Sequence, residues 1–170
     1  MLEDDFDDGD SDGWTINKSP ASAVTWSVSQ QDAHSDPYSL QASNQLGVVF
    51  GSGWTTADSP PFPMDPSGDG SLMVRYFRTL VGGGLSDTEA SLTVLWQYRT
   101  AEGATWLTAE KLEDVMNSGL WEEAVFAIEP PGGVLQVRIR FYFQYSCSQP
   151  QGCDMRANID DFRMGWDGCM

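Results

Sequence analysis

The residues LQVRIRFYFQ at positions 135–144 show the strictest alternation in the chain. The odd positions are all apolar: Leu135, Val137, Ile139, Phe141 and Phe143. Successive side chains of a strand point to opposite faces, so this pattern predicts a half-buried antiparallel strand. Its length predicts a central position in a sheet.

Short segments of β-type sequence, separated by turn residues, account for most of the remaining chain. They are residues 13–17, 23–29, 38–42, 47–56, 71–80, 90–98, 121–128 and 157–165, together with a strand that starts at Trp106. Residues 109–116 could instead form one or two helical turns. Four prolines predict an irregular loop over residues 57–70.

This arrangement predicts an all-β fold with about ten strands and little helix. We expect an antiparallel β-sandwich of the jelly-roll type, either concanavalin A-like or galactose-binding-like. The length of 170 residues suits one domain with a substantial core, and no linker divides the chain. The sequence therefore predicts a single domain over residues 1–170.

The chain is strongly acidic, with 25 Asp and Glu against 9 Lys and Arg and a net charge of −16. This charge argues against nucleic acid and anionic membranes as partners and favours divalent cations. No run is long and apolar enough to cross a bilayer, so no membrane insertion is expected. Acids follow Met1 almost at once, without the basic and apolar regions of a signal peptide.

The three cysteines help to predict the cellular location of the chain. Cys147 and Cys153 bracket a short polar loop, and we predict a disulfide between them, with two free thiols as the alternative. Cys169 could be free or pair outside this segment. Zinc is not expected, because the usual ligand pairs are missing. The chain is either cytosolic or the mature part of a secreted precursor, and the predicted disulfide favours an extracellular or cell-surface location.

The last β-type segment, ANIDDFRMG at residues 157–165, contains two adjacent acids. Strict alternation would place Asp160 on the same face as Phe162 and Met164, and Asp161 on the other face. Asp160 is therefore predicted to point toward the core. A buried carboxylate is costly unless it is paired or bound to a metal.

Residues 1–13 form an acidic segment, predicted to be the first strand and to carry an ion site. Seven carboxylates lie in residues 3–13, and DGDSDG at 8–13 includes the alternating acids and glycine of half an EF-hand loop. The match ends there, because Ser19 and Pro20 stand where the bidentate acid is needed. A disordered acidic tail is the alternative, but Phe6 and Trp14 argue against it as large apolar anchors.

Four landmarks together resemble an extracellular jelly-roll superfamily, which includes MAM domains, bacterial choice-of-anchor J domains and calcium-stabilised carbohydrate-binding modules. They are DFDDG at 5–9 with GWT at 13–15; Trp26 with PYSL at 37–40 and DSP at 58–60; VLWQY at 94–98 through Trp106 and Trp121 to VRIRF at 137–141; and IDDF at 159–162. MAM domains keep cysteines near their start, and this chain has none there, which favours the bacterial branches.

The resemblance implies a structural calcium ion shared by Asp7 and Asp160. Many relatives have Glu at the position of Asp7, so Asp5 or Asp8 could substitute for it. The crowded acids independently favour calcium, which takes about 6–8 oxygen ligands. The alternative is an acidic surface in which backbone amides, or an arginine such as Arg163, hold Asp160.

Nothing in the sequence assembles a catalytic site. His34 is the only histidine and no nucleophile motif accompanies it. Two facing carboxylates would suffice for a glycosidase, but Asp160 and Asp161 are predicted on opposite faces. We therefore expect a non-enzyme, with a hydrolase kept as an alternative.

Aromatic side chains offer a possible ligand surface, because their faces can stack on sugar rings. Alternation predicts that Trp96, Trp106 and Trp121 belong to the core. The better exposed candidates are Trp54, Phe62 and Tyr142. Arg138 and Arg140 share the polar face of their strand with Tyr142, so this face is the predicted ligand groove.

The sequence predicts a non-catalytic, calcium-stabilised recognition module of a secreted or cell-surface protein that binds glycan or protein. The main alternative is a structural or adhesive unit that packs on neighbouring domains or subunits. A secreted hydrolase domain is the second alternative.

Overall fold

A computed structural model describes residues 1–44, 49–64, 71–82, 88–115, 119–149 and 152–166. These residues contain twelve strands and no helix. The strands are β1 (Leu2–Asp4), β2 (Thr15–Lys18), β3 (Thr25–Ser29), β4 (Ser39–Ser43), β5 (Gly51–Asp58), β6 (Phe62–Pro63), β7 (Leu72–Val81), β8 (Thr88–Arg99), β9 (Leu107–Val115), β10 (Glu122–Ile128), β11 (Gln136–Cys147) and β12 (Arg156–Trp166).

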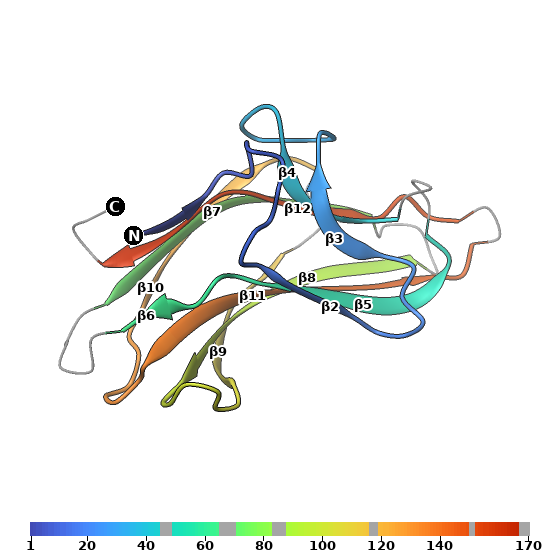
Figure 1. Ribbon diagram of the computed structural model, residues 1–170. Helices are drawn as coiled ribbons and strands as arrows, with labels where there is room; N and C mark the ends of the chain where they lie inside the picture. The colour runs from blue at the N-terminus through green and yellow to red at the C-terminus, as the bar shows by residue number, and fades with distance from the viewer. Residues whose placement is uncertain (45–48, 65–70, 83–87, 116–118, 150–151, 167–170) are drawn as a thin grey trace.

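The strands form two antiparallel sheets that pack face to face as a sandwich (Figure 1). Sheet A has the order β10-β7-β12-β4-β3, with β1 also paired to β12. Sheet B has the order β2-β5-β11-β8-β9, with β6 also paired to β11. The predicted all-β sandwich is confirmed. None of the described residues forms a helix that could span a membrane.

Strand β11 lies in the middle of sheet B, between β5 and β8, as its alternation predicts. Its odd positions point between the sheets. The ring of Phe141 lies 5.0 Å from that of Tyr76 on β7 and 6.1 Å from that of Phe162 on β12, both in sheet A. The aromatic core therefore joins the central strands of the two layers.

The N-terminal acidic segment is ordered rather than a loose tail. Phe6 and Trp14 are buried, and Trp14 packs against Phe6 and Phe162. The indole nitrogen of Trp14 also donates a hydrogen bond of 2.6 Å to Asp4. These contacts confirm the two aromatic residues as anchors of the segment.

Two local predictions are wrong. Residues 109–115 belong to strand β9, because pairing with β8 along its length overrides the helical pattern; Met116 lies outside the described residues. The predicted irregular loop begins later than expected, since Ala57 and Asp58 end β5 and β6 pairs with β11. Its residues 65–70 are not described.

The predicted face of Asp160 in the last strand is also wrong, whereas Phe162 and Met164 are buried in the core as predicted. The pairing of β12 with β7 shifts between Asp160 and Arg163, and Asp161 has a φ of 50°. This is a β-bulge, which adds one residue and reverses the alternation beyond it. Ile159 and Phe162 therefore both face the core, whereas Asp160 faces outward from the sandwich.

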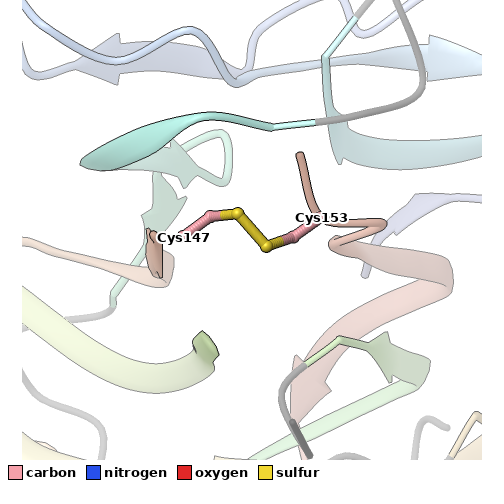
Figure 2. Close-up of a disulfide and its surroundings, with 2 residues drawn as sticks. All are labelled: Cys147 and Cys153. Atoms are coloured by element: carbon pink, nitrogen blue, oxygen red, sulfur yellow. A yellow bond between two sulfur atoms is a disulfide. The ribbon is translucent and has the colours of Figure 1, made fainter. Parts of the chain in front are cut away.

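The predicted disulfide between Cys147 and Cys153 is present, with the two Cα atoms 6.0 Å apart (Figure 2). It joins the end of β11 to a short bridge between Val49 and Cys153, next to β5. Cys169 lies outside the described residues.

Candidate functional site

The outer face of sheet B carries most of the side chains predicted to bind a ligand. The register places Arg140 beside Asp58 of β5 and Gln144 beside Trp54. Because the odd positions of β11 fill the core, its even positions point outward, away from sheet A. Neighbouring strands therefore present their side chains on one continuous surface.

Two aromatic residues form a pair on this face, near the middle of β5 and β11. The rings of Trp54 and Tyr142 are stacked, with centroids 6.0 Å apart and an angle of 27° between their planes. Both residues are partly exposed. Two residues that are distant in the sequence thus make a single aromatic platform at the surface.

Arginines surround one buried carboxylate beside this platform. Asp58 is 1% exposed and accepts hydrogen bonds from Arg140 Nε at 2.6 Å and Arg140 Nη2 at 2.7 Å. Arg138 Nη1 lies 2.9 Å from the same carboxylate. The two-pronged contact of Arg140 with Asp58 fixes the orientation of its guanidinium group.

The electrostatics of the two arginines differ. The hydrogen bond to Asp58 raises the pKa of Arg140. Burial, together with the smaller effects of the positive charges of Arg140 and Arg99, lowers the pKa of Arg138 to about 10, against the attraction of Asp58. Arg138 thus lies in a partly desolvated position between one carboxylate and two further guanidinium groups.

Trp106 extends this face and was predicted wrongly as a core residue. It is partly exposed, and the guanidinium carbons of Arg138 and Arg99 lie 4.4 Å and 4.8 Å from its ring centroid. Arg138 and Arg99 also donate hydrogen bonds to the amides of Gln97 and Gln136, at 2.9 Å and 2.6 Å. A third aromatic residue therefore lies beside the arginines of this face.

Phe62 does not belong to this surface. It is 6% exposed, pairs with Val137 of β11 and packs edge-on against Trp166 at 5.9 Å. The expectation of an exposed Phe62 is wrong because the proline-flanked segment pairs as β6 and turns this ring inward.

Some of the residues missed by the sequence analysis had a detectable signal. Asp58 has the same parity as Trp54 along β5, and Gln97 and Arg99 share the outward parity of β8. Trp106 was misassigned because it lies just before β9, so the alternation from which its burial was predicted does not apply to it.

Asp160 lies at a different place, under residues 30–37 on the outer side of sheet A. Its side chain accepts hydrogen bonds from the backbone N–H groups of His34 at 2.8 Å, Ser35 at 2.9 Å and Asp161 at 2.8 Å. Arg163 pairs with Glu3 at 2.8 Å instead. Backbone amides, one of the two alternatives for Asp160, therefore hold this carboxylate.

The four predicted calcium ligands fit an ion site only in part. Both oxygens of Asp160 already accept N–H groups. Partial desolvation and the carboxylates of Asp5 and Asp161 raise the pKa of Asp7, which shows acidic crowding on this side. Within the described ranges, no three acid, histidine or cysteine side chains are arranged to hold a metal. An ion here would depend on backbone carbonyls and water as well.

Alternation predicted that the two acids of β12 point to opposite faces, and this prediction is wrong. The Ser35 hydroxyl lies 3.4 Å from Asp160 Oδ2 and 3.3 Å from Asp161 Oδ1. His34 Nδ1 lies 2.8 Å from Asp161, and its ring stacks on Phe77 with centroids 3.6 Å apart. The bulge directs both carboxylates to the same loop.

Neither a protein-family model nor a curated protein matches this sequence, but solved structures share its fold. The C-terminal family 22 carbohydrate binding module of Clostridium thermocellum Xyn10B has a TM-score of 0.60 and 15% identity, covering 99% of this chain and 95% of that chain. The CBM22-2 xylan-binding domain from Paenibacillus barcinonensis Xyn10C has a TM-score of 0.56 and 17% identity, covering 97% and 98%.

A third structure is the enzymatically active domain of bacteriophage CBA120 tailspike protein 4. Its TM-score is 0.60 and its identity 11%, covering 95% of this chain and 20% of that chain. At these identities the similarity establishes the β-sandwich fold alone. What the chain binds has to be argued from its own residues.

Proposed function

We propose that this chain is a non-catalytic glycan-binding module whose ligand lies on the outer face of sheet B. The observation that carries the proposal is the stacked pair of Trp54 and Tyr142, partly exposed beside hydrogen-bonding groups. Aromatic faces bury the apolar side of a sugar ring, and the adjoining polar groups can bond to its hydroxyls.

The similar solved structures support this choice of ligand class, because several are described as xylan-binding domains. Xylan is therefore the first polysaccharide to test. The disulfide supports a location outside the cytosol, since such bridges persist in oxidising compartments.

Affinity electrophoresis in gels that contain xylans, glucans or mannans tests the proposal. We expect at least one polysaccharide to retard the protein, and Trp54→Ala to weaken that binding about tenfold or more because the stacking surface is lost. Val125→Ala, which truncates an exposed apolar residue on β10 of sheet A, should bind normally. Absence of retardation in every gel, together with self-association in light scattering, would favour a structural or adhesive unit.

We also propose calcium as a stabilising ion on the acidic side of sheet A. The proximity of Asp5, Asp7 and Asp161 supports it, because their mutual repulsion would be relieved by a cation. Calcium should raise the midpoint of thermal unfolding relative to a chelator, through preferential binding to the folded state. Asp7→Asn should reduce this shift, whereas Asp114→Asn on β9 should leave it intact. Equal midpoints with calcium and with chelator would contradict the proposal.

A further inference from the structure

We infer that the glycan bound on sheet B is anionic, and that its acidic group, a uronate carboxylate or a sulfate ester, binds beside Arg99, Arg138 and Arg140. This inference rests on the proposed glycan-binding function and specifies its ligand class. It follows from how charge is distributed over the face, from the hydrogen-bonding groups left available, and from the spacing of the aromatic platform.

Positive charge is concentrated on this face of an otherwise acidic protein. The chain has nine Lys and Arg in 170 residues and a net charge of −16. Three of these nine, Arg99, Arg138 and Arg140, lie close enough for the charges of Arg99 and Arg140 to act on Arg138. Asp58 pairs with Arg138 and Arg140, whereas Arg99 donates to the neutral amide of Gln136. Two of the three guanidinium groups therefore share one carboxylate, and the third has a neutral partner.

This excess of positive charge is partly desolvated. Arg138 is 9% exposed, and burial lowers its pKa, with smaller contributions from Arg140 and Arg99 and against the attraction of Asp58. An acidic group that binds here would form charge-assisted hydrogen bonds in a partly water-excluded place, where such bonds are about twice as strong as neutral ones.

Donors remain to bind that group. Arg140 uses Nε and Nη2 for Asp58, and Arg99 uses Nε for Gln136. The Nη groups of Arg99 donate to no residue that the structure describes. Guanidinium groups bind carboxylates and sulfates through paired N–H donors in one plane. The partly exposed indole of Trp106 holds the guanidinium groups of Arg99 and Arg138 from one side.

The platform and the arginines are arranged for a chain of sugars. Arg138 and Tyr142 are four residues apart on β11, which corresponds to about 13 Å along a strand. This span exceeds one sugar ring, so a single ligand that reaches both must be an oligosaccharide. One residue would stack on Trp54 and Tyr142 while the acidic group of another meets the arginines.

The net charge opposes a polyanion only at long range. At about 0.15 M ionic strength the screening length is about 8 Å, so charges elsewhere on the sandwich contribute little at the site. Measurements at this ionic strength therefore report the local contacts.

Isothermal titration calorimetry with a matched polymer series provides the test. Glucuronoxylan is compared with the same polymer after reduction of its carboxyl groups to alcohols, and with a sulfated xylan. We expect glucuronoxylan or sulfated xylan to bind about tenfold tighter than the carboxyl-reduced polymer. Arg99→Gln should abolish most of that ratio, and it leaves the pairs of Asp58 intact. Arg156→Gln on β12 removes the same charge from sheet A and should preserve the ratio.

Each outcome has a distinct meaning. Equal affinity for native, carboxyl-reduced and sulfated polymers would overturn the inference while leaving glycan binding in place. A ratio that Arg99→Gln does not change would also overturn it, because the preference would arise elsewhere. A preference for the sulfated polymer that depends on Arg99 would support the inference and assign a sulfate ester. Failure of every polysaccharide to bind would instead remove the proposed function.

Discussion

Asp161 adopts a backbone conformation that most residues avoid, and the surrounding contacts compensate for it. A φ of 50° lies in the left-handed region, which costs a non-glycine residue on the order of 1 kcal/mol, although Asp tolerates it better than most. His34 Nδ1 and Ser35 Oγ lie 2.8 Å and 3.3 Å from its carboxylate. The bulge and residues 30–37 therefore stabilise each other.

The neighbouring Asp160 should contribute stability that decreases as the pH rises in calcium-free buffer. Burial raises its pKa to about 6, against the N–H donors of Ser35, Asp161 and His34, which act to lower it. The folded state then binds more protons than the unfolded state between the unfolded value of 3.8 and about 6. The stability that Asp160 contributes is thus complete below pH 4 and is lost as the pH rises to 6.

Urea denaturation of the wild type and Asp160→Asn at several pH values between 4 and 7 measures this contribution. The variant should be less stable throughout by about 1–3 kcal/mol, because the N–H of Asp161 loses its acceptor. The difference in the free energy of unfolding between the two proteins should shrink as the pH rises. Taking this difference cancels the titration of the other acids, which both proteins share. A difference that grows with pH would show that Asp160 is stabilised as an anion, as a bound cation would require.

At the residue scale, the sequence predicts faces well only where a strand keeps strict alternation. Arg138, Arg140 and Tyr142 lie on one face, as their parity requires, because β11 pairs without a bulge. The prediction for the face of Asp160 is wrong because the bulge lies at Asp161, and no glycine in the sequence indicates it. The burial of Asp160 was predicted, but for the wrong reason, since residues 30–37 cover it on the outer side of sheet A.

At the element scale, the disulfide fixes the connection from β11 to β12. The six-residue separation of Cys147 and Cys153 closes a short loop, and restricting the unfolded chain in this way contributes about 2 kcal/mol. Replacing both cysteines by serine should lower the free energy of unfolding by about that amount. The wild type with reductant should approach the variant in guanidinium denaturation, and the variant should not respond to reductant. A wild type insensitive to reductant under unfolding conditions would contradict this role.

The elements themselves were largely predictable, and the exceptions have a common cause. Segments with clear alternation, such as β8 and β11, formed strands where expected. Strand β9 resembled a helix, and β6 lay in a proline-rich segment, because both are held by pairing with an adjacent strand rather than by their own pattern. Such tertiary pairing leaves little trace in a local sequence.

At the scale of the whole molecule, a polar contact joins the two sheets at one edge. Tyr76 of β7 donates a hydrogen bond of 2.6 Å to Glu113 of β9, and Arg78 Nη2 lies 2.8 Å from the same carboxylate. Burial, followed by the charge of Glu113, raises the pKa of Tyr76 well above its usual value, so the hydroxyl stays a donor. The aromatic core therefore ends in an ion pair shared between layers.

This contact should stabilise the sandwich more than an exposed ion pair does. Glu113→Gln leaves the largely buried Arg78 without its main carboxylate, and we expect a loss of about 2–3 kcal/mol. Tyr76→Phe should cost about 1–2 kcal/mol, because Glu113 keeps Arg78. The matched control is Glu123→Gln, which removes the same charge from the exposed pair with Arg75 within sheet A and should cost less than about 1 kcal/mol. Urea denaturation compares the three, and equal losses for Glu113→Gln and Glu123→Gln would show that the sheets are held by the apolar core alone.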